Sequence, residues 1–341
     1  MTEERDQQAP QASRRIGVLG AGGQLGRCLV RQIDAAPDLE LCFALTRREL
    51  DLSQAESLAA GIRALLDRPE SERPEVVINA AAYTKVDLCE SEQALAYQTN
   101  ALAPAEWSRQ LAPLGIRFIH VSTDYVFPGD GVRPYREDDP TDPRTVYGAS
   151  KRAGEIAVLG NDPQALVVRT SWVFGPGRNF VVAILEQAAK RRAGEAEGPL
   201  RVVDDQRGSP TSAEDLAFAL LAIARQEPER WGGGLLHLRN AGETTWFGFA
   251  REILDQAGFG DIEIEPVPSS TFETAARRPA YSVLDCSWAE GKGIAMPHFR
   301  DALSRYLAGP DRPAVLADPD PSHPSTGASE AVGESRQEVS R

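Results

Sequence analysis

Residues 14–26 read RRIGVLGAGGQLG, an apolar run followed at once by a glycine-rich turn. The run has the continuous apolar character of a strand that is buried on both faces. Gly20, Gly23 and Gly26 allow a tight turn and a close backbone approach to a pyrophosphate, and the helix predicted to follow turns its N-terminus toward that charge. This stretch therefore predicts the first βα unit of a dinucleotide-binding fold.

The alternation of short apolar runs and amphipathic stretches continues along the chain. Strands are expected at 40–46, 74–80, 116–123 and 165–175, with helices between them. Pro104 is expected to start a new helix or to kink the long one predicted around it. The predicted fold class is therefore α/β, with a Rossmann-type doubly wound parallel sheet.

Four segments are expected along the chain. Residues 14–175 mainly form the NAD(P)-binding Rossmann domain, and residues 176–308 mainly form a smaller mixed α/β substrate lobe with some return to the sheet. That lobe has fewer long apolar strands and includes a short one at GLLHLRN, residues 234–240. The two ends, residues 1–13 and 309–341, are polar and poor in large apolar groups, which predicts disorder in both.

Composition excludes several classes of function. Acidic residues outnumber basic ones by 50 to 37, so the formal charge of −13 argues against a nucleic-acid or anionic-membrane binder. The polar N-terminus and the absence of long apolar runs predict a cytoplasmic protein. The four cysteines form no CxxC pair and the four histidines no ligand spacing, so no metal site is predicted.

Tyr147 and Lys151 are spaced four residues apart in a predicted helix. They therefore share one face, where the ammonium can lower the pKa of the phenol and make it a usable acid or base. Thr123 and Asp124 follow the strand at 116–123, at the carboxyl edge of the sheet, where a hydroxyl can hold a substrate carbonyl. Each feature alone has a structural explanation, a chance surface pair or a Ser/Thr turn, but together with the glycine loop they indicate hydride transfer.

Six stretches extend this pattern to a family. They are NAAAYTKVD (79–87), STDYVFPGD (122–130), YGASKRAGE (147–155), RTSWVFG (169–175), DQRGSPT (205–211) and RRP (277–279). Together they resemble the dTDP-4-dehydrorhamnose reductases, members of the extended short-chain dehydrogenases/reductases, over about residues 14–308. Nucleotide-sugar 4,6-dehydratases have a Glu where this chain has Tyr125, so elimination of water is disfavoured.

The resemblance implies an NAD(P)H-dependent reductase that converts dTDP-4-dehydro-β-L-rhamnose (dTDP-4-dehydro-6-deoxy-L-mannose) to dTDP-L-rhamnose for cell-surface polysaccharide synthesis. Tyr147 would protonate the C4 keto oxygen, Lys151 would tune Tyr147 and hold the nicotinamide ribose, and Thr123 would hydrogen-bond the carbonyl. The implied substrate residues are Thr123, Asp124, Tyr147, Trp172 and Arg278. The implied cofactor residues are Gly20, Gly23, Gln24, Leu25, Gly26, Arg47, Asp51, Leu52, Ala81, Ala82, Tyr83, Tyr147 and Lys151.

One position departs from the family. Some members bind Mg²⁺ at a dimer contact through a Glu two residues beyond the third glycine, where this chain has Cys28. A thiol is a poor ligand for this hard cation, which puts Mg²⁺ binding in doubt. A homodimer is still compatible with the resemblance.

The predicted cofactor is NADPH, with NADH usable. An acid at the end of the second strand would bind a ribose 2′-hydroxyl and repel a 2′-phosphate, but Thr46, Arg47 and Arg48 come there before the first acid, Glu49. The alternative is that both arginines lie on a solvated loop. Two other functions stay open: reduction or epimerisation of another nucleotide sugar, and a non-catalytic regulatory subunit similar to that of methionine adenosyltransferase.

Overall fold

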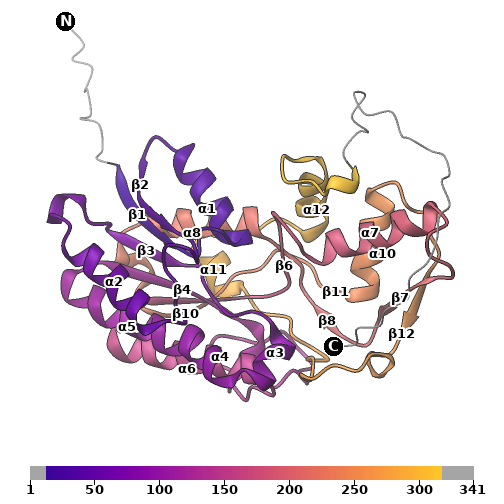
Figure 1. Cartoon of the computed structure of the whole chain (residues 1–341), viewed down its shortest axis with the longest axis horizontal. Coiled ribbons are helices and arrows are strands. Elements are labelled where there is room, and N and C mark those ends of the chain that lie inside the picture. Colours follow the sequence, from indigo (N-terminus) through magenta and orange to yellow (C-terminus); the bar gives the residue numbers. More distant parts are fainter. Residues whose placement is uncertain (1–12, 317–341) are drawn as a thin grey trace, which may run out of the picture.

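The computed structural model describes residues 13–316. Six parallel strands form a central sheet in the order β10-β5-β4-β3-β1-β2 (Figure 1). The strands are β1 (Arg14–Leu19), β2 (Leu39–Leu45), β3 (Val76–Asn79), β4 (Arg117–Thr123), β5 (Leu166–Thr170) and β10 (Gly234–His237). The predicted fold class is confirmed.

Alternate residues of each strand pack against helices on opposite faces of the sheet. Ile16 and Val18 point into a core shared with α1 (Gln24–Asp34) and α8 (Ala213–Ala224). Leu19 points into the opposite core. That core lies under α2 (Ala55–Leu66), α5 (Ala103–Leu111) and α6 (Val146–Asn161). Because both faces are covered, apolar residues on both faces of the strands are buried.

The helical segment between β3 and β4 is irregular. It contains α3 (Val86–Ser91), α4 (Gln93–Tyr97), a π-helical turn at Gln98–Leu102, and α5. Pro104 lies directly after the π-helical turn, and Leu102 and Ala103 keep helical dihedral angles, so the helical run from Gln93 to Leu111 continues through the proline. Of the two predicted alternatives, the structure therefore shows a distorted helix and not a separate one.

A second lobe contributes a separate core built on Phe174, Ile184, Phe249 and Phe299. Its longer elements are α7 (Phe180–Arg192), β7 (Leu200–Val203), α10 (Trp246–Gln256), β12 (Ile264–Val267) and α12 (Phe299–Ala308). The short strands and helices of this half are β6 (Val173–Phe174), β8 (Arg207–Gly208), β9 (Thr211–Ser212), α9 (Pro228–Trp231), β11 (Thr244–Thr245) and α11 (Ser287–Gly291).

Parts of the second half lie with the sheet. The short strand expected at residues 234–240 is β10, which pairs with β5 at the sheet edge, and α8 packs on α1. Within residues 309–316, expected to belong to a disordered tail, Ala314–Leu316 form a short 3-10 turn near α7, and Asp311 pairs with Arg31. The remaining tail expectations, for 1–12 and 317–341, lie outside the described residues. Among residues 13–316, no helix combines the length and apolarity needed to cross a bilayer.

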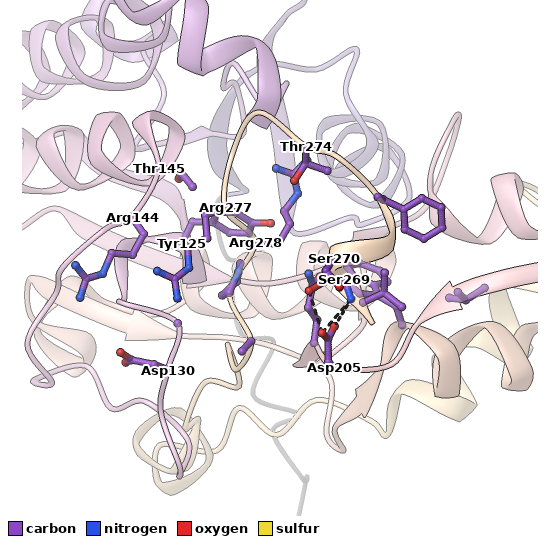
Figure 2. Close-up of a pocket in the computed structure, with 18 of the residues that line it drawn as sticks. Tyr125, Asp130, Arg144, Thr145, Asp205, Ser269, Ser270, Thr274, Arg277 and Arg278 are labelled. Atoms are coloured by element: carbon purple, nitrogen blue, oxygen red, sulfur yellow. Dashed lines mark hydrogen bonds between the residues drawn. The ribbon is translucent and has the colours of Figure 1, made fainter. Parts of the chain in front are cut away.

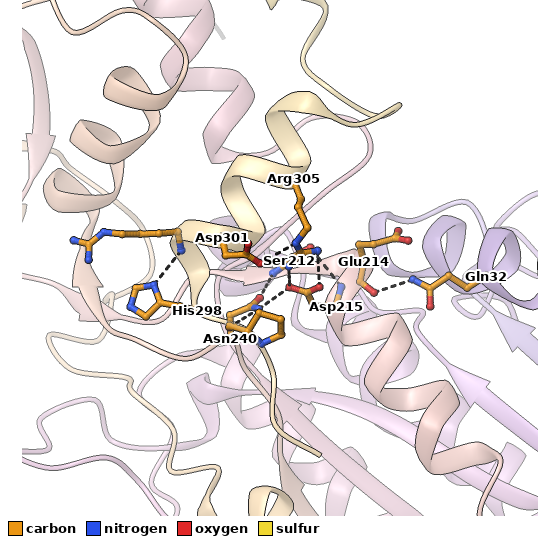
Figure 3. Close-up of polar contacts among 10 residues, drawn as sticks. Gln32, Ser212, Glu214, Asp215, Asn240, His298, Asp301 and Arg305 are labelled. Atoms are coloured by element: carbon orange, nitrogen blue, oxygen red, sulfur yellow. Dashed lines mark hydrogen bonds and ion pairs between the residues drawn. The ribbon is translucent and has the colours of Figure 1, made fainter. Parts of the chain in front are cut away.

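A buried polar network joins α8 to α12 (Figure 3). The Asn240 amide accepts a hydrogen bond from the Ser212 N–H at 2.7 Å and donates to Asp215 at 2.7 Å and to the Pro297 carbonyl at 2.9 Å. The Arg305 guanidinium donates to both oxygens of Asp215 at 2.9 Å. Asn240 therefore satisfies polar groups of three segments that meet beneath the lobe boundary.

Asn240→Ala is expected to lower the free energy of unfolding by about 2–4 kcal/mol, because each buried polar group left unpaired costs about 1–3 kcal/mol. Arg300→Ala, which breaks an exposed pair with Glu252, should cost no more than about 1 kcal/mol. Urea denaturation followed by circular dichroism measures both. Equal losses for the two variants would contradict the role given to Asn240.

Candidate active site

The glycine turn after β1 brings two backbone segments into contact. Gly20 has a positive φ of 79°, and a Cβ built on it would lie 2.6 Å from the Ala81 nitrogen. A Cβ on Gly26 would lie 2.1 Å from the Gly20 carbonyl oxygen. Only glycine permits this packing, which leaves the first turn of α1, beginning after Gly23, open toward a cavity.

A cavity of about 600 Å³ lies along this turn and the ends of β1, β2 and β3. Of the residues for which the resemblance implies cofactor contact, eight line it: Gly20, Gly23, Arg47, Asp51, Leu52, Ala81, Ala82 and Tyr83. Leu25 and Gly26 are buried beneath the turn, Gln24 reaches toward the Arg178 carbonyl, and Tyr147 and Lys151 lie outside this lining. The cavity is the size of a site for a small organic cofactor, and the bare glycine backbone fits a dinucleotide.

The end of β2 falls where the sequence predicts it, at Leu45 directly before Thr46. Arg47 lies 3.6 Å from Asp51, and the Glu49 carboxylate turns back to accept the Thr46 N–H at 2.9 Å. Within residues 13–316, Arg48 forms no ion pair. Both arginines and Glu49 line the cavity, so Arg48 is the more available cation.

Thr123 and Tyr147 meet at the carboxyl edge of the sheet, and Lys151, one helical turn further along α6, hydrogen-bonds the Val121 carbonyl of β4. Thr145 caps α6 by accepting the Gly148 N–H at 3.0 Å, and a Cβ on Gly148 would lie 2.1 Å from the Tyr125 carbonyl oxygen. This close approach sets the first turn of α6 against the end of β4. Tyr147 is 9% exposed, and its ring centroid lies 5.5 Å from that of Tyr125. Tyr83, which lines the first cavity, packs against the same hydrophobic cluster.

Burial dominates the electrostatics here. It raises the pKa of Tyr147, although the Thr123 hydroxyl acts in the opposite direction. The lowering expected from Lys151 is not seen, because burial outweighs it. Burial lowers the pKa of Lys151 to about 8, against the attraction of Glu155. Burial raises the pKa of Asp124 to about 6, and this carboxyl accepts a hydrogen bond from the Thr123 hydroxyl at 2.9 Å. Such shifts are typical of catalytic sites.

Asn100 is a residue that the sequence analysis missed. It lies in the π-helical turn before α5, accepts the Tyr83 N–H at 2.7 Å and donates to the Ser150 hydroxyl at 3.0 Å. Ser150 in turn donates to the Tyr147 carbonyl at 2.8 Å. Asn100 thus connects the cofactor-side loop to the helix that carries Tyr147, and no local sequence pattern marks it.

A second cavity, of about 660 Å³, lies on the other side of Tyr125, between the sheet edge and the second lobe (Figure 2). Arg144, Arg277 and Arg278 project from its sides. Asp205 accepts hydrogen bonds from the N–H and hydroxyl of Ser269 at 2.9 Å, which fixes one loop of the lining. A largely apolar cavity with several guanidiniums suits a ligand that carries both rings and a phosphate.

Two of the predicted substrate residues have partners that the sequence did not indicate. Arg278 lines the second cavity and forms a two-pronged ion pair with Asp87 of α3, with distances of 3.0 and 2.5 Å. Trp172 has a φ of 45° and stacks on Trp246 with ring centroids 3.5 Å apart. Trp246, rather than Trp172, lines the cavity.

The surroundings of Cys28 do not fit a divalent cation. The Arg31 guanidinium lies between the Glu214 and Asp311 carboxylates, hydrogen-bonds both, and lies 3.9 Å from the Cys28 sulfur. Burial raises the pKa of the Cys28 thiol, so it stays protonated. Within residues 13–316, no group of three or more His, Cys, Asp or Glu side chains could hold a metal. Arg31 already supplies the positive charge that a cation would bring.

Adding EDTA or Mg²⁺ is therefore expected to leave the melting temperature of the wild-type protein unchanged. Arg31→Ala should lower it, because Glu214 and Asp311 then lose their shared partner. Mg²⁺ should restore part of that loss. Differential scanning fluorimetry measures all three effects, and a clear fall in the wild-type melting temperature on adding EDTA would refute this assignment.

The doubly wound sheet, the glycine turn, the two cavities and the Thr, Tyr and Lys side chains define a nicotinamide-dependent oxidoreductase. Comparison with known proteins makes the class specific. The chain belongs to the family described as RmlD substrate binding domain, which matches residues 14–310.

Named relatives cover nearly the whole of this match. A dTDP-4-dehydrorhamnose reductase of Mycobacterium tuberculosis is 42% identical over 305 residues, 87% of this chain and 94% of that protein. A Streptomyces antibioticus protein named "Probable dTDP-4,6-dihydroxy-2-methyloxan-3-one 4-ketoreductase" is 39% identical over 91% of this chain and 97% of its own length. The crystal structure of dTDP-4-dehydrorhamnose reductase from Bacillus anthracis in complex with NADP is 30% identical, covers 87% of this chain and 99% of that one, and superposes with a TM-score of 0.75.

Proposed function

We propose that this protein reduces the C4 keto group of dTDP-4-dehydro-β-L-rhamnose with NADPH and forms dTDP-L-rhamnose. The position of Tyr147 carries the proposal, because it packs against Tyr125, which lines the second cavity, and shares a hydrophobic cluster with Tyr83, which lines the first. The names of the relatives supply the identity of the sugar nucleotide.

The residues of the chain divide the chemistry between them. The nicotinamide, when bound, supplies the hydride for the carbonyl carbon. Tyr147 gives its phenolic proton to the carbonyl oxygen, so that the ketone gains one hydride and one proton and becomes an alcohol. The Thr123 hydroxyl donates a hydrogen bond to the same oxygen, and the Lys151 ammonium stabilises the phenolate that Tyr147 leaves behind.

Other residues bind and orient. Gly20, Gly23 and the first turn of α1 would receive the cofactor phosphates, and Ala81, Ala82 and Tyr83 would contact its middle. Arg278, held by Asp87, and Trp246, held by Trp172, would orient the sugar nucleotide. These rigid supports favour a single substrate pose. In the protein without substrate the Thr123 hydroxyl donates its one hydrogen to Asp124, so this hydrogen would have to turn from the carboxylate to the carbonyl oxygen when the sugar binds.

The test is a panel of 4-keto nucleotide sugars, each mixed with enzyme and NADPH while the nicotinamide absorbance is followed. The expected result is the highest kcat/KM with dTDP-4-dehydro-β-L-rhamnose, and a product that mass spectrometry finds two hydrogens heavier than the substrate. If none of the sugars causes NADPH to be consumed, the non-catalytic regulatory subunit is favoured instead. The presence of Thr123, Tyr147 and Lys151 argues for an enzyme.

A second candidate is the same reaction on a different dTDP-linked keto sugar. The name of the Streptomyces antibioticus relative, a 4-ketoreductase, favours it. The same panel separates the two candidates, because the second predicts a higher kcat/KM for another 4-keto sugar.

A further inference from the structure

A chain of buried hydrogen bonds ends at the side-chain nitrogen of Lys151. Ala81 lines the cavity along the glycine turn. The chain begins at its N–H, which donates to Asn79 Oδ1 at 3.0 Å. Asn79 Nδ2 lies 3.0 Å from His120 Nδ1, and His120 Nε2 lies 3.3 Å from Lys151 Nζ. Asn79 and His120 are fully buried, and Lys151 is 1% exposed.

The direction of each bond follows from the one before it. A backbone N–H can only donate, so the Asn79 oxygen faces Ala81 and the Asn79 amide hydrogens face His120 Nδ1. Nδ1 must then accept, which places the proton of the neutral imidazole on Nε2, directed at Lys151. An amine has a lone pair that can accept this hydrogen bond, whereas an ammonium has none. The chain of bonds therefore favours the neutral form of Lys151.

The other groups around Lys151 do not reverse this preference. The Val121 carbonyl accepts a hydrogen bond from Nζ at 2.7 Å, which either form of Lys151 can donate. Glu155, one helical turn further along α6, attracts a proton to Lys151, but the Arg169 guanidinium binds both of its oxygens at 2.8 Å. Burial and the nearby Lys151 hold the pKa of His120 well below its usual value, so the imidazole stays neutral.

We propose that Asn79 and His120 are positioning residues for catalysis, which bring the amine and ammonium forms of Lys151 close to balance at the pH of the cell. The inference rests on the proposed reductase function. Each turnover consumes one proton, which leaves Tyr147 for the substrate oxygen and has to be replaced from water. A lysine that gains and loses a proton readily can assist this replacement, whereas a permanently charged one releases its proton too slowly.

Asn79→Asp tests the proposal with almost no change of shape. A carboxylate can only accept, so it should still bind the Ala81 N–H and should now accept a hydrogen bond from His120 Nδ1, which moves the imidazole proton from Nε2 to Nδ1. Nε2 would then become an acceptor for the Lys151 ammonium. The proton affinity of Lys151 is expected to rise about tenfold, or one pH unit.

The titration can be measured without substrate. The chain has four lysines, Lys85, Lys151, Lys190 and Lys292, so ¹³C-lysine labelling gives four resolvable side-chain signals, and Lys151→Met assigns the one needed. In the wild type this signal should titrate near pH 8. Titration of wild-type Lys151 near the ordinary lysine value of about 10.4 would overturn the proposal even if every variant failed to fold.

A double variant separates the hydrogen-bond effect from the new negative charge. Asn79→Asp combined with His120→Phe retains the carboxylate but removes the imidazole, so it should show less than half of the shift seen in Asn79→Asp alone. An equal shift in both would show that charge alone acts through space, which contradicts the proposal. Melting curves of each variant check the fold.

Activity supplies an independent readout. Because the ammonium form assists Tyr147, kcat/KM should fall as the pH rises past the pKa of Lys151. In Asn79→Asp this alkaline fall of the pH profile should move to higher pH by the same amount as the NMR titration of Lys151. An alkaline fall that does not move would refute the catalytic part of the inference. If no 4-keto sugar is reduced at all, the proposed function fails, while the NMR titration still decides how Lys151 is tuned.

Discussion

Tyr147→Phe is expected to lower kcat by about 10²–10⁴-fold while the affinity for NADPH stays close to that of the wild type. The proposed reaction takes its proton from the Tyr147 phenol, and the substitution removes only the oxygen of that phenol. Tyr147 is buried against Tyr125, so the ring of phenylalanine keeps the packing. Initial rates and fluorescence titration with NADPH measure the two quantities.

Tyr97→Phe is the matched control, because Tyr97 lies partly exposed on α4 and removal of its hydroxyl should leave kcat unchanged. A Tyr147→Phe enzyme that retains more than about a tenth of the wild-type rate would show that another group donates the proton. A loss of NADPH affinity equal to the loss of rate would show instead that Tyr147 acts mainly in binding.

The second large effect concerns the choice between NADPH and NADH. We expect NADPH to be preferred by about ten- to a hundredfold in kcat/KM, because a guanidinium paired with a phosphate contributes roughly 1.5–3 kcal/mol. Arg48→Ala should remove most of this preference. Arg47→Ala should remove less, because Arg47 lies beside Asp51 and its side chain is 74% exposed.

Arg63→Ala, on the exposed side of α2, changes the net charge equally and should leave the cofactor ratio unchanged. The measurement is kcat/KM with each nicotinamide at one ionic strength, since screening weakens exposed charge pairs. Equal values for NADPH and NADH in the wild type would mean that both arginines lie in solvent. That outcome would leave the reductase function untouched.

The sequence by itself determined the Rossmann half of the molecule. The stretch at 74–80 contains the continuous apolar run 76–78, and a sheet covered on both faces can bury every residue of such a run. Gly20 and Gly26 are similarly specific, because the close contacts at these positions exclude any side chain. Pro104 marked a distortion of the helix around it for the local reason that it lacks an N–H. These signals are local, so sequence alone carries them.

The tertiary structure alone decided where the short elements and the paired side chains lie. The four residues of β10 carry no information about which sheet they join, and only packing places them beside β5. Trp246 stacks on Trp172 and Arg278 pairs with Asp87 across separations of 74 and 191 residues, which no periodicity encodes. The preference of Lys151 for its amine form likewise depends on Asn79 and His120, which lie on two neighbouring strands. No sequence pattern predicts it, since hydrogen-bond direction and burial exist only once the chain has folded.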